Sequence, residues 1–116
     1  NVEIMGEKLK ESLQLFKEEI PQIGDVRGRG LMVGIEIVDT SQKPLNNGAY
    51  PYNPNLALQI QKECFNRGLI LEVGGRKGCV IRFLPPLNII ETQLNKAIDI
   101  FKESVKAALR KKGEEI

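Results

Sequence analysis

The sequence predicts an α+β domain of two layers, in which helices cover one face of a small, mainly antiparallel sheet. Three segments place apolar residues at intervals of three and four, as amphipathic helices do: residues 2–19, 54–67 and 91–111. Two further segments, 25–38 and 69–84, are rich in Val, Ile and Leu and contain glycines, as strand pairs joined by turns do. The predicted order is helix, strand pair, helix, strand pair, helix, with about four strands around one core.

The first helix is predicted from a single apolar stripe, with charged residues elsewhere around the cylinder. The stripe consists of Met5, Leu9, Leu13, Phe16 and Ile20. Pro21 follows, and proline disfavours the helical conformation of the residue before it. We therefore expect the helix to end before Pro21.

Residues 25–38 are predicted to form a hairpin whose turn lies at Gly28 to Gly30, because glycines supply the positive φ that tight turns need. After the turn, every second residue is apolar and these residues form one face. They are Leu31, Val33, Ile35 and Ile37. A dinucleotide-binding loop requires a helix after its glycines, whereas a strand follows here, so that kind of site is excluded.

Residues 39–53 have the composition of a loop, with Asn, Gly, Pro and Ser. A connection of about fifteen residues is longer than most, and such loops are often functional or mobile. Asn53 then precedes Pro54, which is the usual combination of a helix cap and a first helical residue. Gly68 is expected to end this second helix.

The last strand surrounds one arginine with apolar residues and is stopped by Pro85 and Pro86. Alternation places Arg82 on the opposite face of the strand from Ile81 and Phe83. A guanidinium in apolar surroundings requires an anionic partner. Two partners fit: an Asp or Glu of the same domain, or the carboxylate of a ligand held by two parallel hydrogen bonds. The residues alone favour the internal ion pair.

Composition and charge exclude several classes of function. The chain has 17 basic and 15 acidic residues, a net charge of +2 that gives no argument for a nucleic-acid or membrane partner. No apolar run approaches the roughly 20 residues of a membrane span and no signal peptide is present, so a cytoplasmic location is expected. Cys64 and Cys79 are not spaced as metal ligands, and we expect buried free thiols. Without histidine, these residues make neither a metal site nor a complete active site.

Four segments, in matching order, resemble the C-terminal small domain of class III aminotransferases, which are pyridoxal-phosphate enzymes of fold type I. The segments are the hairpin at 26–36, the helix-to-strand passage at 67–70, the element Arg82-Phe83-Leu84-Pro85-Pro86-Leu87 and the final helix. Within the class, the run Leu71-Glu72-Val73-Gly74-Gly75-Arg76 and the pair Cys64-Phe65 are most similar to diaminobutyrate–2-oxoglutarate aminotransferases. The chain departs from the pattern at Ile90, where Thr or Ser commonly caps the last helix.

The resemblance implies a parent enzyme that moves an amino group from L-2,4-diaminobutyrate, or a related ω-amino donor, to 2-oxoglutarate, giving an aldehyde product and glutamate. It implies that residues 1–116 form a single domain, and that the large domain with the coenzyme lysine precedes Asn1. The chain starts without Met and already in a helical pattern, so we expect it to be a piece of a longer, cytoplasmic, homodimeric protein. The piece alone is expected to be inactive, with no catalytic, cofactor-binding or metal-binding residues.

By position, the resemblance implies that Arg82 takes a carboxylate of the amino-acid or oxo-acid substrate, which makes ligand binding its favoured role. Arg76, in the glycine turn, is a weaker candidate for substrate binding, and an exposed turn residue fits it equally well. Lys62, Lys77 and Lys96 are expected to be surface residues. The alternative to an enzyme domain is a free-standing α+β module that binds a small molecule or a protein at the end of the Arg82 strand.

Overall fold

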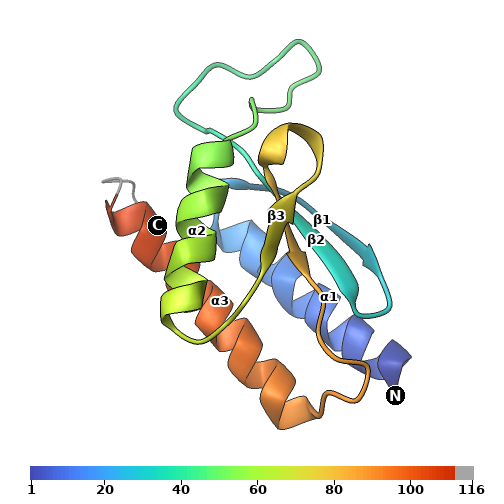
Figure 1. Cartoon of the computed structure of the whole chain (residues 1–116). Coiled ribbons are helices and arrows are strands. Elements are labelled where there is room, and N and C mark those ends of the chain that lie inside the picture. The colour runs from blue at the N-terminus through green and yellow to red at the C-terminus, as the bar shows by residue number, and fades with distance from the viewer. Residues whose placement is uncertain (112–116) are drawn as a thin grey trace.

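Residues 1–111 are described by a computed structural model, with the exception of the side chain of Arg76. The elements are helix α1 (Val2–Glu19), strands β1 (Ile23–Arg29) and β2 (Met32–Ile37), helix α2 (Pro54–Asn66), strand β3 (Glu72–Gly74), the 3₁₀ turn η1 (Arg76–Gly78), strand β4 (Val80–Phe83) and helix α3 (Glu91–Lys111). The helices pack on one side of the sheet and share one core with it (Figure 1). The predicted α+β class and element order are confirmed.

The sheet is antiparallel throughout, with the strand order β1-β2-β4-β3. The two hairpins therefore join through β2 and β4, which lie at the centre of the sheet. One row of cross-strand partners, Val26, Ile35, Ile81 and Val73, crosses all four strands. All four belong to the core or pack against it, so this row marks the face of the sheet that the helices cover.

Three aromatic rings connect the layers of the core. The Phe101 ring of α3 meets Phe16 of α1 edge-on, with the ring centroids 6.2 Å apart. It also meets Phe83 of β4 edge-on at 5.1 Å. Such geometry adds to the area that the rings bury, because the positive edge of one ring faces the negative face of the other. Phe101 therefore packs α3 against both helix α1 and the central strand β4.

The first turn includes Gly30, as predicted, but begins two residues later than expected. Strand β1 continues through Gly28 to Arg29, and the turn consists of Gly30 and Leu31, with Gly30 at φ 58°. A Cβ atom at position 28 would lie 2.2 Å from the carbonyl oxygen of Met32. Gly28 is thus required by a close approach of two backbones, and only Gly30 is required by the turn.

The strand predicted at 69–73 is shorter and lies later, at Glu72–Gly74. Gly68 has φ 90° and ends α2 as expected. The carbonyl oxygen of Leu71 accepts a hydrogen bond of 2.9 Å from Nε2 of Gln61. The backbone carbonyl just before β3 is therefore hydrogen-bonded to a side chain of α2. Pairing with β4 starts at the next residue, Glu72.

The start of α2 agrees with the prediction. The side-chain oxygen of Asn53 accepts a hydrogen bond of 3.1 Å from the backbone N–H of Leu56, and Pro54 is the first helical residue. The preceding loop is closed at its base by an isolated bridge between Val38 and Tyr52. Its residues 41–50 are exposed, and Figure 1 shows the loop extending away from the sheet and helices.

A buried carboxylate connects α2 to the end of α3. The Glu63 side chain is only 5% exposed, yet it forms ion pairs with Arg67 at 2.8 Å and with Lys111 at 2.6 Å. The hydrogen bonds from Lys111 and then Arg67 lower the pKa of Glu63 from 4.5 to about 2. The folded state therefore stabilises the ionised form of the Glu63 carboxyl group.

We expect this carboxylate to make the free energy of unfolding depend on pH. A folded-state pKa below the unfolded value means that the contribution is fully present above about pH 4.5 and is lost as the pH falls towards 2. Denaturant midpoints between pH 2 and 6 should show this loss, and Glu63→Gln should flatten it. The exposed Glu18→Gln serves as the control. Equal pH profiles for the wild type and Glu63→Gln would contradict the expectation.

Within residues 1–111, no helix has both the length and the apolar character that crossing a membrane requires. The same residues contain no group of three or more His, Cys, Asp or Glu side chains that could hold a metal ion. Both cysteines are buried thiols outside any disulfide, as predicted. Burial raises the pKa of Cys64 and of Cys79, so neither favours the reactive thiolate.

Candidate functional site

The face of the sheet that carries no helix holds a row of charged residues. Arg27 pairs with Gly34, Gly34 with Arg82 and Arg82 with Glu72, so the row crosses β1, β2, β4 and β3. Side chains of directly paired residues lie on the same side of a sheet. Two arginines and one glutamate therefore share this face, with a glycine between the arginines. We call it the open face of the sheet.

Arg82 has an internal partner on this face. Its Nη1 atom donates a hydrogen bond of 2.9 Å to Oε1 of Glu72, the residue directly opposite on β3. The Arg82 side chain is 39% exposed and that of Glu72 is 56% exposed. The expectation of an arginine in apolar, buried surroundings was therefore wrong, because no layer covers this face. An ion pair this exposed contributes little, about 0–1 kcal/mol.

Arg27 is held more firmly than Arg82. Its Nη1 atom donates to Asp25 at 2.8 Å and to Glu36 at 3.3 Å. The hydrogen bonds to Asp25 and then Glu36 raise the pKa of the Arg27 guanidinium. Arg27 thus has two internal carboxylates, whereas Glu72 is the one carboxylate within ion-pairing distance of Arg82 among the described residues. A ligand carboxylate would therefore displace fewer internal ion pairs at Arg82 than at Arg27.

A shallow hollow of about 270 Å³ lies between the two arginines. Besides Arg27 and Arg82, its lining consists of Met32, Val33, Gly34, Gly75 and Val80. The two glycines have no side chains to fill the hollow, and the arginines supply hydrogen-bond donors that suit a carboxylate. The arrangement can bind and orient an anion.

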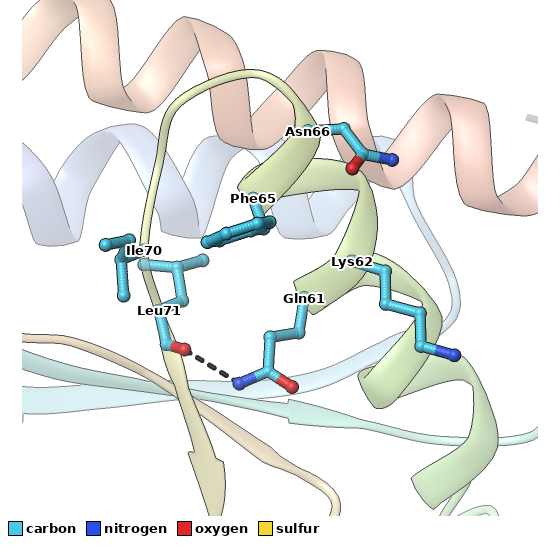
Figure 2. A pocket seen from close by; sticks show the side chains of 6 residues that line it. All are labelled: Gln61, Lys62, Phe65, Asn66, Ile70 and Leu71. Carbon is cyan, nitrogen blue, oxygen red and sulfur yellow. Dashed lines mark hydrogen bonds between the residues drawn. The ribbon is translucent and has the colours of Figure 1, made fainter.

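A second hollow, of about 400 Å³, lies away from these charges, between the end of α2 and the segment before β3. Figure 2 shows Phe65, Ile70 and Leu71 on one side, and Gln61, Lys62 and Asn66 on the other. Two of its three apolar residues are strongly exposed, Phe65 by 66% and Ile70 by 81%, whereas Leu71 is buried. The hollow is mainly apolar, and of its six lining residues only Lys62 is ionisable.

The other predicted site residues can be placed only in part. The side chain of Arg76 lies outside the described residues, although its backbone begins the η1 turn beside Gly75. Lys62, Lys77 and Lys96 are exposed, as expected. Glu72 and Arg27, by contrast, were missed by sequence reasoning. Both residues could have been found from the strand register, which decides which residues lie opposite one another. The register can be derived from the sequence only when the positions of the turns are known.

No described lysine fits the Schiff-base role that pyridoxal phosphate requires. Every lysine in residues 1–111 is exposed or half-exposed. A Schiff-base amine must be desolvated or lie near another cation to act as a nucleophile at neutral pH. The residues present here therefore do not form a pyridoxal-phosphate site.

Comparisons with known proteins agree on one family. The sequence profile described as aminotransferase class-III matches residues 1–105. The chain is 47% identical over 110 residues to a diaminobutyrate–2-oxoglutarate aminotransferase of Haemophilus influenzae, covering 95% of this chain and 24% of that protein. It is 43% identical to a protein of the same name from Rhizobium meliloti, covering 80% of this chain and 20% of that one.

Solved structures give the same result. The crystal structure of a Bacillus anthracis aminotransferase superposes with a TM-score of 0.76 at 29% identity, over 90% of this chain and 23% of that one. This chain thus spans about a quarter of the length of the relatives that it matches.

Proposed function

The chain belongs to the class III aminotransferases, and on that basis we propose that it is the C-terminal small domain of a diaminobutyrate–2-oxoglutarate aminotransferase. The whole enzyme would move the ω-amino group of L-2,4-diaminobutyrate, or of a related donor, to 2-oxoglutarate, giving an aldehyde and glutamate. Identity of 47% to a relative of that name, over 95% of this chain, supports the substrate assignment.

Arg82 is the residue that we propose for substrate binding, and its place on the open face carries the proposal. It is half-exposed, it lines a hollow, and its internal partner is an exposed glutamate that a ligand carboxylate can replace at small cost. The guanidinium fork then offers two parallel hydrogen bonds to a carboxylate of the amino acid or the oxo acid. Arg76 remains a weaker proposal of the same kind, on the glycine turn that borders the hollow.

The described residues do not form a coenzyme site, so we propose that the large and small domains of the enzyme have different roles. Pyridoxal phosphate, when bound to an aminotransferase, supplies the electron sink for the transfer. Its lysine and phosphate site would belong to a large domain outside this chain, since no described lysine is buried. The present residues would contribute one wall of the substrate site and orient the substrate carboxylate. We further propose that the full-length protein is a cytoplasmic homodimer, as the family resemblance implies.

The experiment compares two proteins, residues 1–116 and the full-length parent. Both are incubated with pyridoxal phosphate, L-2,4-diaminobutyrate and 2-oxoglutarate, and glutamate is measured. We expect glutamate only from the parent, because no described lysine of the short chain is placed to form a Schiff base. Borohydride reduction followed by mass spectrometry should find no coenzyme attached to residues 1–116.

Two results would overturn the proposal. A parent that fails with every ω-amino donor would remove the enzymatic assignment and favour the alternative, an α+β module that binds a small molecule or a protein. A stoichiometric, reducible coenzyme adduct on residues 1–116 would show that the short chain contains its own cofactor site.

A further inference from the structure

We propose that Gly74 is a positioning residue for Arg82, because a side chain at position 74 would press on the end of the guanidinium. The inference rests on the proposed role of Arg82 in binding a substrate carboxylate. It adds a second residue to that role, one that touches no substrate and acts only through the arginine.

The geometry of β3 and β4 brings the two residues together. Arg82 pairs with Glu72, so Gly74 lies two residues further along the same strand and on the same face as Glu72. A Cβ atom built on Gly74 would lie 3.3 Å from Nη1, 3.8 Å from Cζ and 3.9 Å from Nη2 of Arg82. Nη1 is the nearest of the three atoms, so the Nη1 end of the guanidinium is the part that a side chain at position 74 would press on first.

Two residues of β3 therefore lie next to the Nη1 end of the guanidinium. Glu72, directly opposite on β3, accepts a hydrogen bond of 2.9 Å from Nη1. Gly74 leaves room beside Nη1, because a Cβ there would approach this atom to 3.3 Å. A bidentate carboxylate requires the fork in one position and plane, so a displacement of its Nη1 end weakens binding even when the charge is kept.

Gly74 and its neighbour Gly75 are needed for different reasons. Gly75 has φ 71°, and a Cβ there would lie 2.7 Å from Cγ2 of Val80, so the η1 turn itself requires glycine. Gly74 has no positive φ, and its close neighbours are atoms at the end of one flexible side chain. Glycine weakens a strand, and at position 74 the backbone gives no reason for it. We attribute the glycine at position 74 to the neighbouring guanidinium of Arg82.

The test uses the full-length parent with Gly74→Ala, Gly74→Val, Arg82→Lys and the double variant Gly74→Val/Arg82→Lys. We expect the KM for 2-oxoglutarate to rise several-fold with Ala and on the order of 10- to 100-fold with Val, since small misplacements of a binding group have effects of this size. The turnover number should change less than KM. The dissociation constant of glutarate, measured by calorimetry, should rise in parallel. The denaturant midpoint should not fall, because valine is a better strand residue than glycine.

The double variant shows whether Gly74 acts through Arg82. If it does, Gly74→Val should change KM less than about twofold in the Arg82→Lys background, because that background has already lost the fork. An undiminished effect there would overturn the inference, as would Gly74→Val with unchanged KM and glutarate binding while Arg82→Lys raises both. If Arg82→Lys itself left KM and glutarate binding unchanged, the proposed function of Arg82 would fall instead. Should the valine variant fail to fold, the alanine variant and its glutarate constant decide.

Discussion

Phe101→Ala is expected to lower the free energy of unfolding of the chain by about 3–5 kcal/mol, the usual cost of removing a fully buried phenylalanine. Phe101 is 0% exposed and its ring meets those of Phe16 and Phe83 edge-on. Truncation removes both ring pairs and leaves a cavity where α1, α3 and the sheet meet. The loss is a large part of the roughly 5–15 kcal/mol that stabilises a domain of this size.

Denaturant unfolding of residues 1–116, followed by circular dichroism, measures this loss. Phe65→Ala is the matched control, because it removes the same ring from a side chain that is 66% exposed, and we expect a change within about 0.5 kcal/mol. If Phe101→Ala abolishes folding, Phe101→Leu gives a measurable intermediate. Similar midpoints for Phe101→Ala and Phe65→Ala would show that Phe101 does not hold the layers together.

The helices and the core could be predicted from the sequence because their signal is periodic and local. All five residues of the first predicted stripe are buried in the structure. The same is true of the four alternating residues after the first turn, from Leu31 to Ile37. A residue's own spacing from its neighbours decides these positions, and no knowledge of other elements is needed.

The turn residues show where local reasoning fails. Gly28, Arg29 and Gly30 give one turn signal, yet only Gly30 lies in the turn. Gly28 is required by the carbonyl of Met32 on the paired strand. Two glycines of the same type thus serve two different physical needs, and the sequence does not separate them.

The charged partners could not be predicted because they depend on register and on packing between distant elements. Glu72 lies opposite Arg82 only because η1 turns the chain back at Arg76–Gly78. Glu63 lies beside the buried Cys64 on α2. Arg67 has the local spacing of a helical ion pair with it, but the second partner of Glu63 is Lys111 at the far end of α3. Neither the pairing of Glu72 nor that with Lys111 has a signature in residue spacing, so the exposed character of the Arg82 pair became visible only in the folded chain.

Arg82→Lys in the full-length parent is expected to lower kcat/KM for both the amino donor and 2-oxoglutarate. Lysine keeps the charge but loses the planar fork, so at least one charged hydrogen bond to the substrate carboxylate is lost. Such a bond contributes about 1.5–3 kcal/mol, which corresponds to roughly a 10- to 150-fold decrease. Steady-state kinetics with each substrate varied in turn measure this. Arg110→Lys, an exposed arginine on α3, is the matched control and should leave the kinetics unchanged.

Arg82→Ala separates substrate binding from a structural role. Because Glu72 is more than half exposed, losing its partner leaves a hydrated carboxylate and not a buried charge. The free energy of unfolding should therefore fall by no more than about 1 kcal/mol. The same protein should lose still more kcat/KM than Arg82→Lys, since the attraction of the charge for the carboxylate is lost as well. Kinetics and a denaturant midpoint on one preparation give both numbers. A large fall in stability with kcat/KM intact would assign Arg82 to the fold, as the ion-pair partner of Glu72.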